Sequence, residues 1–129
     1  MKPFTILFVS LFVAACCAPL AAAEPDFAKT IGPILSKRCL GCHNASEAKG
    51  ELVLLSREGL LKGGESGTVV DPKNPAESVL LKKVVAGEMP PEEMGKSQAL
   101  PKEEVELIRA WIMAGAKWPE GMVLNPFEV

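Results

Sequence analysis

Apolar residues recur at the spacing of an α-helix in four stretches of the chain, and polar segments rich in glycine and proline separate these stretches. The first stretch, 26–42, contains Pro33 early enough to mark a helix start or a kink. A second, short helix is predicted over 56–62, with Ser56 as its N-cap.

Two further helices have clear start and stop signals. The segment Asn74-Pro75-Ala76-Glu77 is typical of a helix cap, so a helix is predicted from 74 to about 86, where Gly87 ends it. The last helix is predicted over 101–115, because its first turn is acidic and Gly115 follows its last apolar residue.

The pattern predicts an all-α fold, a small bundle of short helices with long Gly/Pro-rich loops. Strand signals are weak and limited to 52–55 and 68–70, and no internal repeat or long linker divides the chain. The apolar positions of the four helices and the loops between them predict the core. Its expected members are Phe27, Ile31, Leu35, Leu54, Leu80, Val84, Leu100, Ile108, Trp111 and Ile112.

The start of the chain has the features of an export signal. Lys2 precedes an apolar run over 4–15, which is shorter than the roughly 20 residues that span a bilayer. Small residues at 21–23 then offer a cleavage site, so 1–23 is interpreted as a signal peptide and 24–129 as the exported domain. The sequence before Cys16 also resembles a bacterial lipobox, which would tether the domain to a membrane through a lipid. Either cut predicts an exported protein, periplasmic and soluble or lipid-anchored.

Composition excludes some classes of function. The chain has 129 residues, which favours one domain, and its net charge of −2 argues against nucleic-acid binding. It contains a single histidine, His43, so a metal site built on two histidines is excluded. Of the four cysteines only Cys39 and Cys42 follow the signal peptide.

These two cysteines and the histidine form the motif Cys39-Leu40-Gly41-Cys42-His43, the attachment signature of c-type haem. Two thiols at this spacing reach the two vinyl groups of the porphyrin, and the residue after the second cysteine places an imidazole at the iron. The sequence therefore predicts one covalent haem c, with Cys39 and Cys42 as thioether attachments and His43 as the proximal ligand.

Three other readings of the motif compete with haem. A thioredoxin-like pair needs a preceding strand, whereas 27–38 reads as a helix. A structural zinc site needs four ligands, one more than the motif supplies. A plain disulfide is the default for an exported chain with two cysteines, but it would leave the histidine unexplained.

The second axial ligand is expected to be a methionine, because no histidine remains and methionine is the usual partner in electron-transfer cytochromes c. The candidates are Met89, Met94, Met113 and Met122. Met89 is favoured, since the two prolines that follow it stiffen its loop. Core packing explains Met113, which lies inside the last predicted helix.

Several motifs resemble the planctomycete-type cytochrome c domain over about 27–119. They are Cys39-Leu-Gly-Cys-His43, Gly50-Glu-Leu-Val-Leu-Leu-Ser56, Gly63-Gly64-Glu-Ser-Gly67, Pro75-Ala-Glu-Ser78, Met89-Pro90-Pro91 and Trp111-Ile112-Met-Ala-Gly115-Ala116. The resemblance implies a mono-haem, class I-like cytochrome in which the N-terminal and C-terminal helices cross. It also implies that Met89 is the distal ligand.

Two classes of function follow. The first is transfer of single electrons between redox partner proteins through a His/Met-ligated haem, with no enzymatic activity. The alternative is a ligand-binding haem protein, a gas sensor or a peroxidase-like enzyme with an open distal site, for which Glu88 or Glu92 would have to act as acid and base. A docking patch for partners could be formed by Lys62, Lys82 and Lys83, although lysines on helices are more often simply solvated.

Overall fold

The computed structural model describes residues 23–127. The predicted signal peptide and the alternative lipidated residue Cys16 lie outside the described residues, apart from Ala23. Within them the chain forms four short α-helices joined by loops, as the periodicity predicts. No helix in this range is long and apolar enough to cross a membrane.

The first predicted helix consists of two helical segments and a separate turn. Phe27–Ile31 is a π-helical segment whose start is capped by Asp26, and α1 follows at Gly32–Arg38 with Pro33 in its first turn. Pro33 therefore marks the start of α1, one of the two roles expected for it. The helix ends at Arg38, so the cysteine motif lies after the helix and not inside it.

The second helix is confirmed, and its ends match its sequence signals. Helix α2 spans Arg57–Lys62, and the Ser56 hydroxyl accepts a hydrogen bond from the Gly59 N–H at 3.3 Å. It ends at Gly63, whose φ of 73° favours glycine.

The single helix predicted over 74–86 is wrong in its first part. Pro75–Glu77 is a 3₁₀ turn, and α3 covers only Val79–Val85. The two are separated by Ser78, which is fully buried and has a non-helical ψ of 122°. Its hydroxyl accepts a hydrogen bond from the Asp71 N–H at 2.8 Å, and this contact holds Ser78 outside a helix. The expected side-chain cap from Asn74 is absent.

The last helix, α4, spans Lys102–Met113, and Gly115 stops it as predicted. The N–H of Gly115 donates to the Ile112 carbonyl at 3.0 Å, and the N–H of Ala116 donates to the Trp111 carbonyl at 2.9 Å. Gly115 has a φ of 102°. These two bonds and the left-handed glycine form a Schellman motif.

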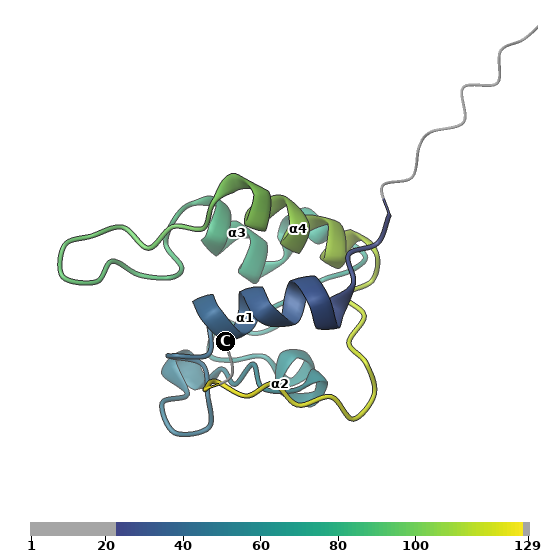
Figure 1. Cartoon of the computed structure of the whole chain (residues 1–129), viewed down its shortest axis with the longest axis horizontal. Coiled ribbons are helices and arrows are strands. Elements are labelled where there is room, and N and C mark those ends of the chain that lie inside the picture. Colours follow the sequence, from purple (N-terminus) through teal and green to yellow (C-terminus); the bar gives the residue numbers. More distant parts are fainter. Residues whose placement is uncertain (1–22, 128–129) are drawn as a thin grey trace, which may run out of the picture.

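The helices stack in the order shown in Figure 1, with α3 and α4 together on one side, α1 in the middle and α2 on the other side. The first turn of the N-terminal helix packs against α4, where the Phe27 and Trp111 rings lie 5.9 Å apart. This contact agrees with the crossing that the resemblance implies. All ten predicted core residues are buried.

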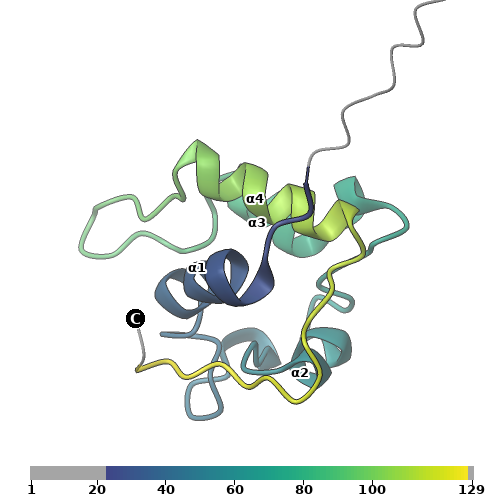
Figure 2. The ribbon, with the colours of Figure 1, turned by 45° about the vertical axis from the view of Figure 1, so that its right-hand side comes forward.

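The C-terminal segment closes the fold without forming a helix. Trp118 packs on Phe27 with ring centroids 4.4 Å apart, and the Leu124 N–H donates to the Leu55 carbonyl at 2.7 Å. Figure 2 shows this segment running from the end of α4 past α1 to α2. The two weak strand candidates form no strand, and the only ladder contacts among residues 23–127 are isolated bridges such as Ser56 with Val123.

Candidate functional site

A cleft of about 200 Å³ opens on one face of the domain and collects the predicted site residues. Cys39, Cys42, His43 and Met89 all line it, although His43 and Met89 lie 46 positions apart in the sequence. Most of the remaining wall is apolar. Its apolar members are Leu52, Leu54, Val69, Val79, Leu80, Val84, Pro90 and Pro91.

The cysteine motif forms one wall of the cleft as a single tight turn. The N–H groups of Cys42 and His43 both donate to the Cys39 carbonyl, at 3.2 and 3.0 Å. The turn is also fixed from outside, because the Lys49 N–H donates to the Cys42 carbonyl and the Leu54 N–H donates to the His43 carbonyl. Both cysteines and the histidine thus lie on one short, well-supported piece of backbone.

Asn44 supports this turn, a role that the sequence analysis did not predict. Its side-chain amide donates to the Leu40 carbonyl at 2.8 Å, and its side-chain oxygen accepts from the N–H groups of Ser46 and Glu47 at 2.8 and 3.0 Å. An asparagine directly after a helical turn is a general signal for such a cap, but it does not by itself indicate a role at a cofactor site.

The imidazole of His43 lines the cleft, so its ring can face a bound cofactor. Its Nδ1 atom is buried and has no hydrogen-bond partner in the described structure. Leaving a buried polar atom unsatisfied costs about 1–3 kcal/mol, so such atoms usually have a functional explanation. The residues that line the cleft fit a haem, because they supply two thiols, an imidazole, a thioether and an apolar wall.

The structure also argues against a disulfide, a dithiol redox site and a zinc site, the three other interpretations of the cysteine motif. Both thiols are free, so the pair does not form a disulfide. Burial, assisted by the charge of Glu104, raises the pKa of the Cys39 thiol to about 12, whereas dithiol redox sites need a thiol with a lowered pKa. Residues 23–127 contain no cluster of three or more His, Cys, Asp or Glu side chains suited to a zinc ion.

Met89 lies on the wall formed by the end of α3 and the loop after it. The N–H groups of Glu88 and Met89 both donate to the Lys83 carbonyl, at 3.0 and 3.3 Å, which fixes the backbone before the methionine. Pro90 and Pro91 follow directly and also line the cleft. The Met89 side chain is 37% exposed, so it lies at the mouth of the cleft.

The other three methionines do not line the cleft. Met94 is 91% exposed at the tip of a projecting loop. Met113, expected in the core, is exposed; its position on α4 faces away from Trp111 and Ile112, which are buried. That expectation is wrong because helix membership alone does not tell which face a residue occupies.

The predicted lysine patch is largely neutralised. Lys82 forms an ion pair with Glu77 at 2.5 Å, and Lys83 forms one with Glu88. Lys83 lines the cleft, whereas Lys62 and Lys82 do not. These pairings join residues five positions apart across a helix end, which periodicity alone does not reveal.

Close backbone contacts explain the glycine-rich loop beside the cleft. A Cβ atom at Gly64 would lie 2.4 Å from the Gly50 carbonyl oxygen, and one at Gly63 would lie 2.2 Å from the Gly67 carbonyl oxygen. Both contacts are too short for any other residue. Gly50 and Gly64 line the cleft, so these glycines shape its wall.

Comparison with known proteins gives one match. Residues 39–93 match the family described as Planctomycete cytochrome C, a stretch that includes the cysteine motif, the glycine-rich loop and Met89. No curated protein and no solved structure matches the chain. The match confirms the resemblance inferred from the sequence motifs over residues 39–93, which are similar to a cytochrome c family whose members generally bind haem c and serve electron transfer.

Proposed function

We propose that the protein is an exported, mono-haem c-type cytochrome that carries single electrons between redox partner proteins. One observation carries the proposal: Cys39, Cys42, His43 and Met89 come from two distant parts of the chain and line the same apolar cleft. The cysteine motif alone does not require Met89 to lie there, so its place in the cleft supports the family expectation that Met89 is the distal ligand.

Each of these side chains has a role in the proposal. Cys39 and Cys42 hold the haem through thioethers, His43 is the proximal ligand of its iron and Met89 is the distal ligand. The bound haem supplies reversible one-electron chemistry between ferric and ferrous iron. The thioether of Met89 favours the ferrous state and raises the reduction potential.

The rest of the cleft supports electron transfer over catalysis. Its apolar wall, including Leu54, Leu80 and Val84, excludes water from the cofactor. Glu88 and Glu92, the acid–base candidates for a peroxidase-like enzyme, do not line the cleft, and Glu88 is paired with Lys83. The alternative of a ligand-binding haem then depends on whether Met89 occupies the sixth coordination position of the iron.

A visible spectrum tests the proposal. We expect the ferric protein to show the weak band at the red end that Met–iron ligation produces, and the ferrous protein to bind carbon monoxide slowly or not at all. Met89→Ala should abolish the band, lower the potential and allow carbon monoxide to bind. Met94→Leu is the matched control and should keep the wild-type spectrum. Rapid carbon monoxide binding by the unmodified protein would instead assign it to the ligand-binding class.

Export is tested separately by the N-terminus of the mature protein. Mass spectrometry that finds Glu24 at the start identifies a soluble periplasmic protein, and a diacylated Cys16 identifies a membrane-tethered one. Protein expressed without 1–23 should remain free of haem in the cytoplasm, since c-type attachment takes place after export. Finding haem on that protein would contradict the proposal.

A further inference from the structure

We propose that Lys49 provides the one positive charge of the cleft wall that no side chain among residues 23–127 pairs, and that this charge shifts the haem's reduction equilibrium toward the ferrous state. This inference rests on the proposed function and concerns how the chain sets the potential of the group it binds. It depends on three features of the structure: the charges on the cleft wall, the backbone that presents Lys49, and the distribution of the nearby carboxylates.

The charges on the cleft wall are all positive. Arg38, Lys49 and Lys83 line the cleft, and no aspartate or glutamate does. Arg38 is neutralised by Glu104 at 2.8 Å, and Lys83 is neutralised by Glu88. Lys49 belongs to none of the ion pairs found among residues 23–127. The net charge that the wall presents to the cleft is therefore that of Lys49.

A strained turn presents this lysine. Ala48, Gly50 and Glu51 have φ values of 38°, 64° and 57°, so three of the four residues at 48–51 are in the left-handed region. Two of them are not glycine, and such conformations persist only where the surrounding structure imposes them. The strain is concentrated on the residues that flank Lys49.

The contacts that impose the turn come from both sides of the cleft entrance. On one side the Lys49 N–H donates to the Cys42 carbonyl at 3.0 Å, which fixes it beside the haem-attachment turn. On the other side the Glu65 N–H donates to the Gly50 carbonyl at 2.8 Å, and Gly64 packs closely against the same carbonyl. The glycine-rich loop thus holds the turn that carries Lys49.

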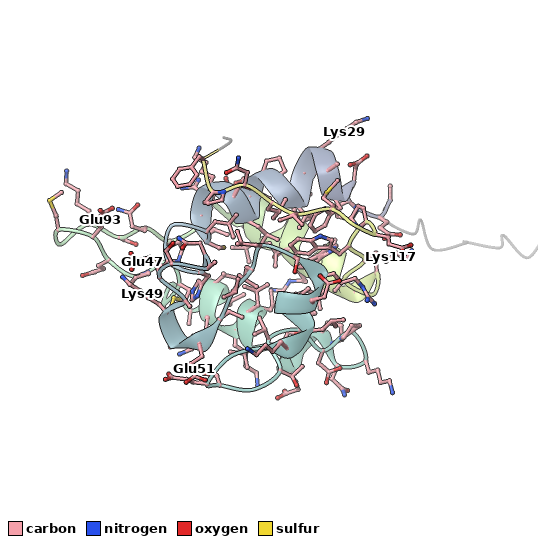
Figure 3. The ribbon with its side chains drawn as sticks, turned by 90° about the horizontal axis from the view of Figure 1, so that it is seen from below. Lys29, Glu47, Lys49, Glu51, Glu93 and Lys117 are labelled. Atoms are coloured by element: carbon pink, nitrogen blue, oxygen red, sulfur yellow. The ribbon has the colours of Figure 1, made fainter. Side chains whose placement is uncertain are left out.

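The carboxylates of this turn do not cancel the lysine inside the cleft. Glu47, Lys49 and Glu51 are all exposed, but of the three only Lys49 lines the cleft. Figure 3 shows Glu47, Lys49 and Glu51 on the side of the molecule from which the loop with Glu93 projects, and Lys29 and Lys117 on the opposite side. A positive charge near the iron disfavours the more positive ferric state, so removing it should favour oxidation.

The test is a potentiometric titration of the exported holoprotein at low ionic strength, in which the visible spectrum reports the ferrous-to-ferric ratio. Lys49→Gln should lower the ferrous-to-ferric ratio at a fixed applied potential about twofold to fivefold, as expected for a partly screened charge. With 59 mV per tenfold change for one electron, this is a shift of about 20–40 mV. Lys49→Arg should keep the wild-type potential, and the Lys49→Gln shift should shrink in 0.5 M salt.

Lys29→Gln is the matched control, because it removes the same charge from the far side of the domain. It should change the potential by less than a third of the Lys49→Gln shift. Equal shifts in potential for Lys49→Gln and Lys29→Gln would overturn the inference. A shift for Lys49→Arg as large as that for Lys49→Gln would overturn it too, because the effect would then come from the shape of the turn and not from the charge. A wild-type protein with no reversible haem spectrum would overturn the proposed function itself, and the two failures are therefore distinguishable.

Discussion

The ion pair between Arg38 and Glu104 links the residue before Cys39 to the first turn of α4. The Arg38 Nε–H donates to one Glu104 oxygen at 2.8 Å and an Nη2–H donates to the other at 3.0 Å. Hydrogen bonding to Glu104 raises the pKa of Arg38, so the arginine stays charged. We expect this pair to stabilise the fold more than the exposed pairs elsewhere in the domain.

The magnitude follows from geometry and burial. Fully buried charge-assisted hydrogen bonds contribute about 1.5–3 kcal/mol each, and exposed ion pairs contribute about 0.2–1 kcal/mol. Each side chain of this pair is 23% exposed, which places the pair between the two limits. We therefore expect a coupling free energy of about 1–2 kcal/mol. Arg38→Met alone leaves a half-buried carboxylate unpaired and should cost about 2 kcal/mol.

A double-mutant cycle measures this coupling. The free energies of unfolding of the wild type, Arg38→Met, Glu104→Gln and the double variant are obtained from urea titrations of the holoprotein. For a domain of this size, Arg38→Met should lower the melting temperature by roughly 8–16 °C. The exposed pair of Lys117 with Glu24 is the control and should couple by less than about 0.5 kcal/mol. Equal coupling in the two pairs would refute the argument from burial.

Three further predictions concern the site and the fold. Cys39→Ala should leave haem held by one thioether or none; acid–acetone extraction of the wild type should leave the colour on the protein, and colour in the solvent would contradict covalent attachment. Gly59→Ala should destabilise α2 by more than about 2 kcal/mol despite alanine's higher helix propensity, because its Cβ would lie 2.1 Å from the Val53 carbonyl oxygen; a urea titration that shows stabilisation would contradict this. Ser78→Ala should cost about 1–3 kcal/mol by leaving the Asp71 N–H without its acceptor, whereas the exposed Ser97→Ala should change stability by less than about 0.5 kcal/mol.

Local signals in the sequence predict much of the fold. The caps and stops of α2 and α4 depend on residues within a few positions, and they were predicted from Ser56 and Gly115. The helix predicted over 74–86 failed because its break depends on Ser78 bonding to Asp71, seven residues earlier and outside the helix. The Arg38–Glu104 pair spans 66 residues and has no local signal at all.

The candidate site shows the same division between local and distant information. The spacing of Cys39, Cys42 and His43 is a local motif, so the sequence alone identifies one wall of the cleft. Met89 was expected at the haem because of the prolines that follow it and because of the family resemblance. In the structure it lines the same cleft as the cysteine motif, because α3 packs so that the loop after it reaches the cleft. Lys49 was not among the predicted site residues, because its place on the cleft wall depends on the close approach of Gly64 to Gly50 in the folded chain.

The backbone of the site is held independently of the side chains that would bind the cofactor. The cysteine turn is fixed by Lys49 and Leu54 donating to the carbonyls of Cys42 and His43, and the Met89 segment is fixed by the Lys83 carbonyl. None of these bonds uses a thiol, an imidazole or a thioether. The functional side chains are therefore free to bind, and substituting one of them should remove a ligand without removing the turn that carries it. This arrangement explains why Met89→Ala should free a coordination position of the iron and yet leave the fold intact. Loss of a ligand and unfolding can therefore be measured separately in this protein.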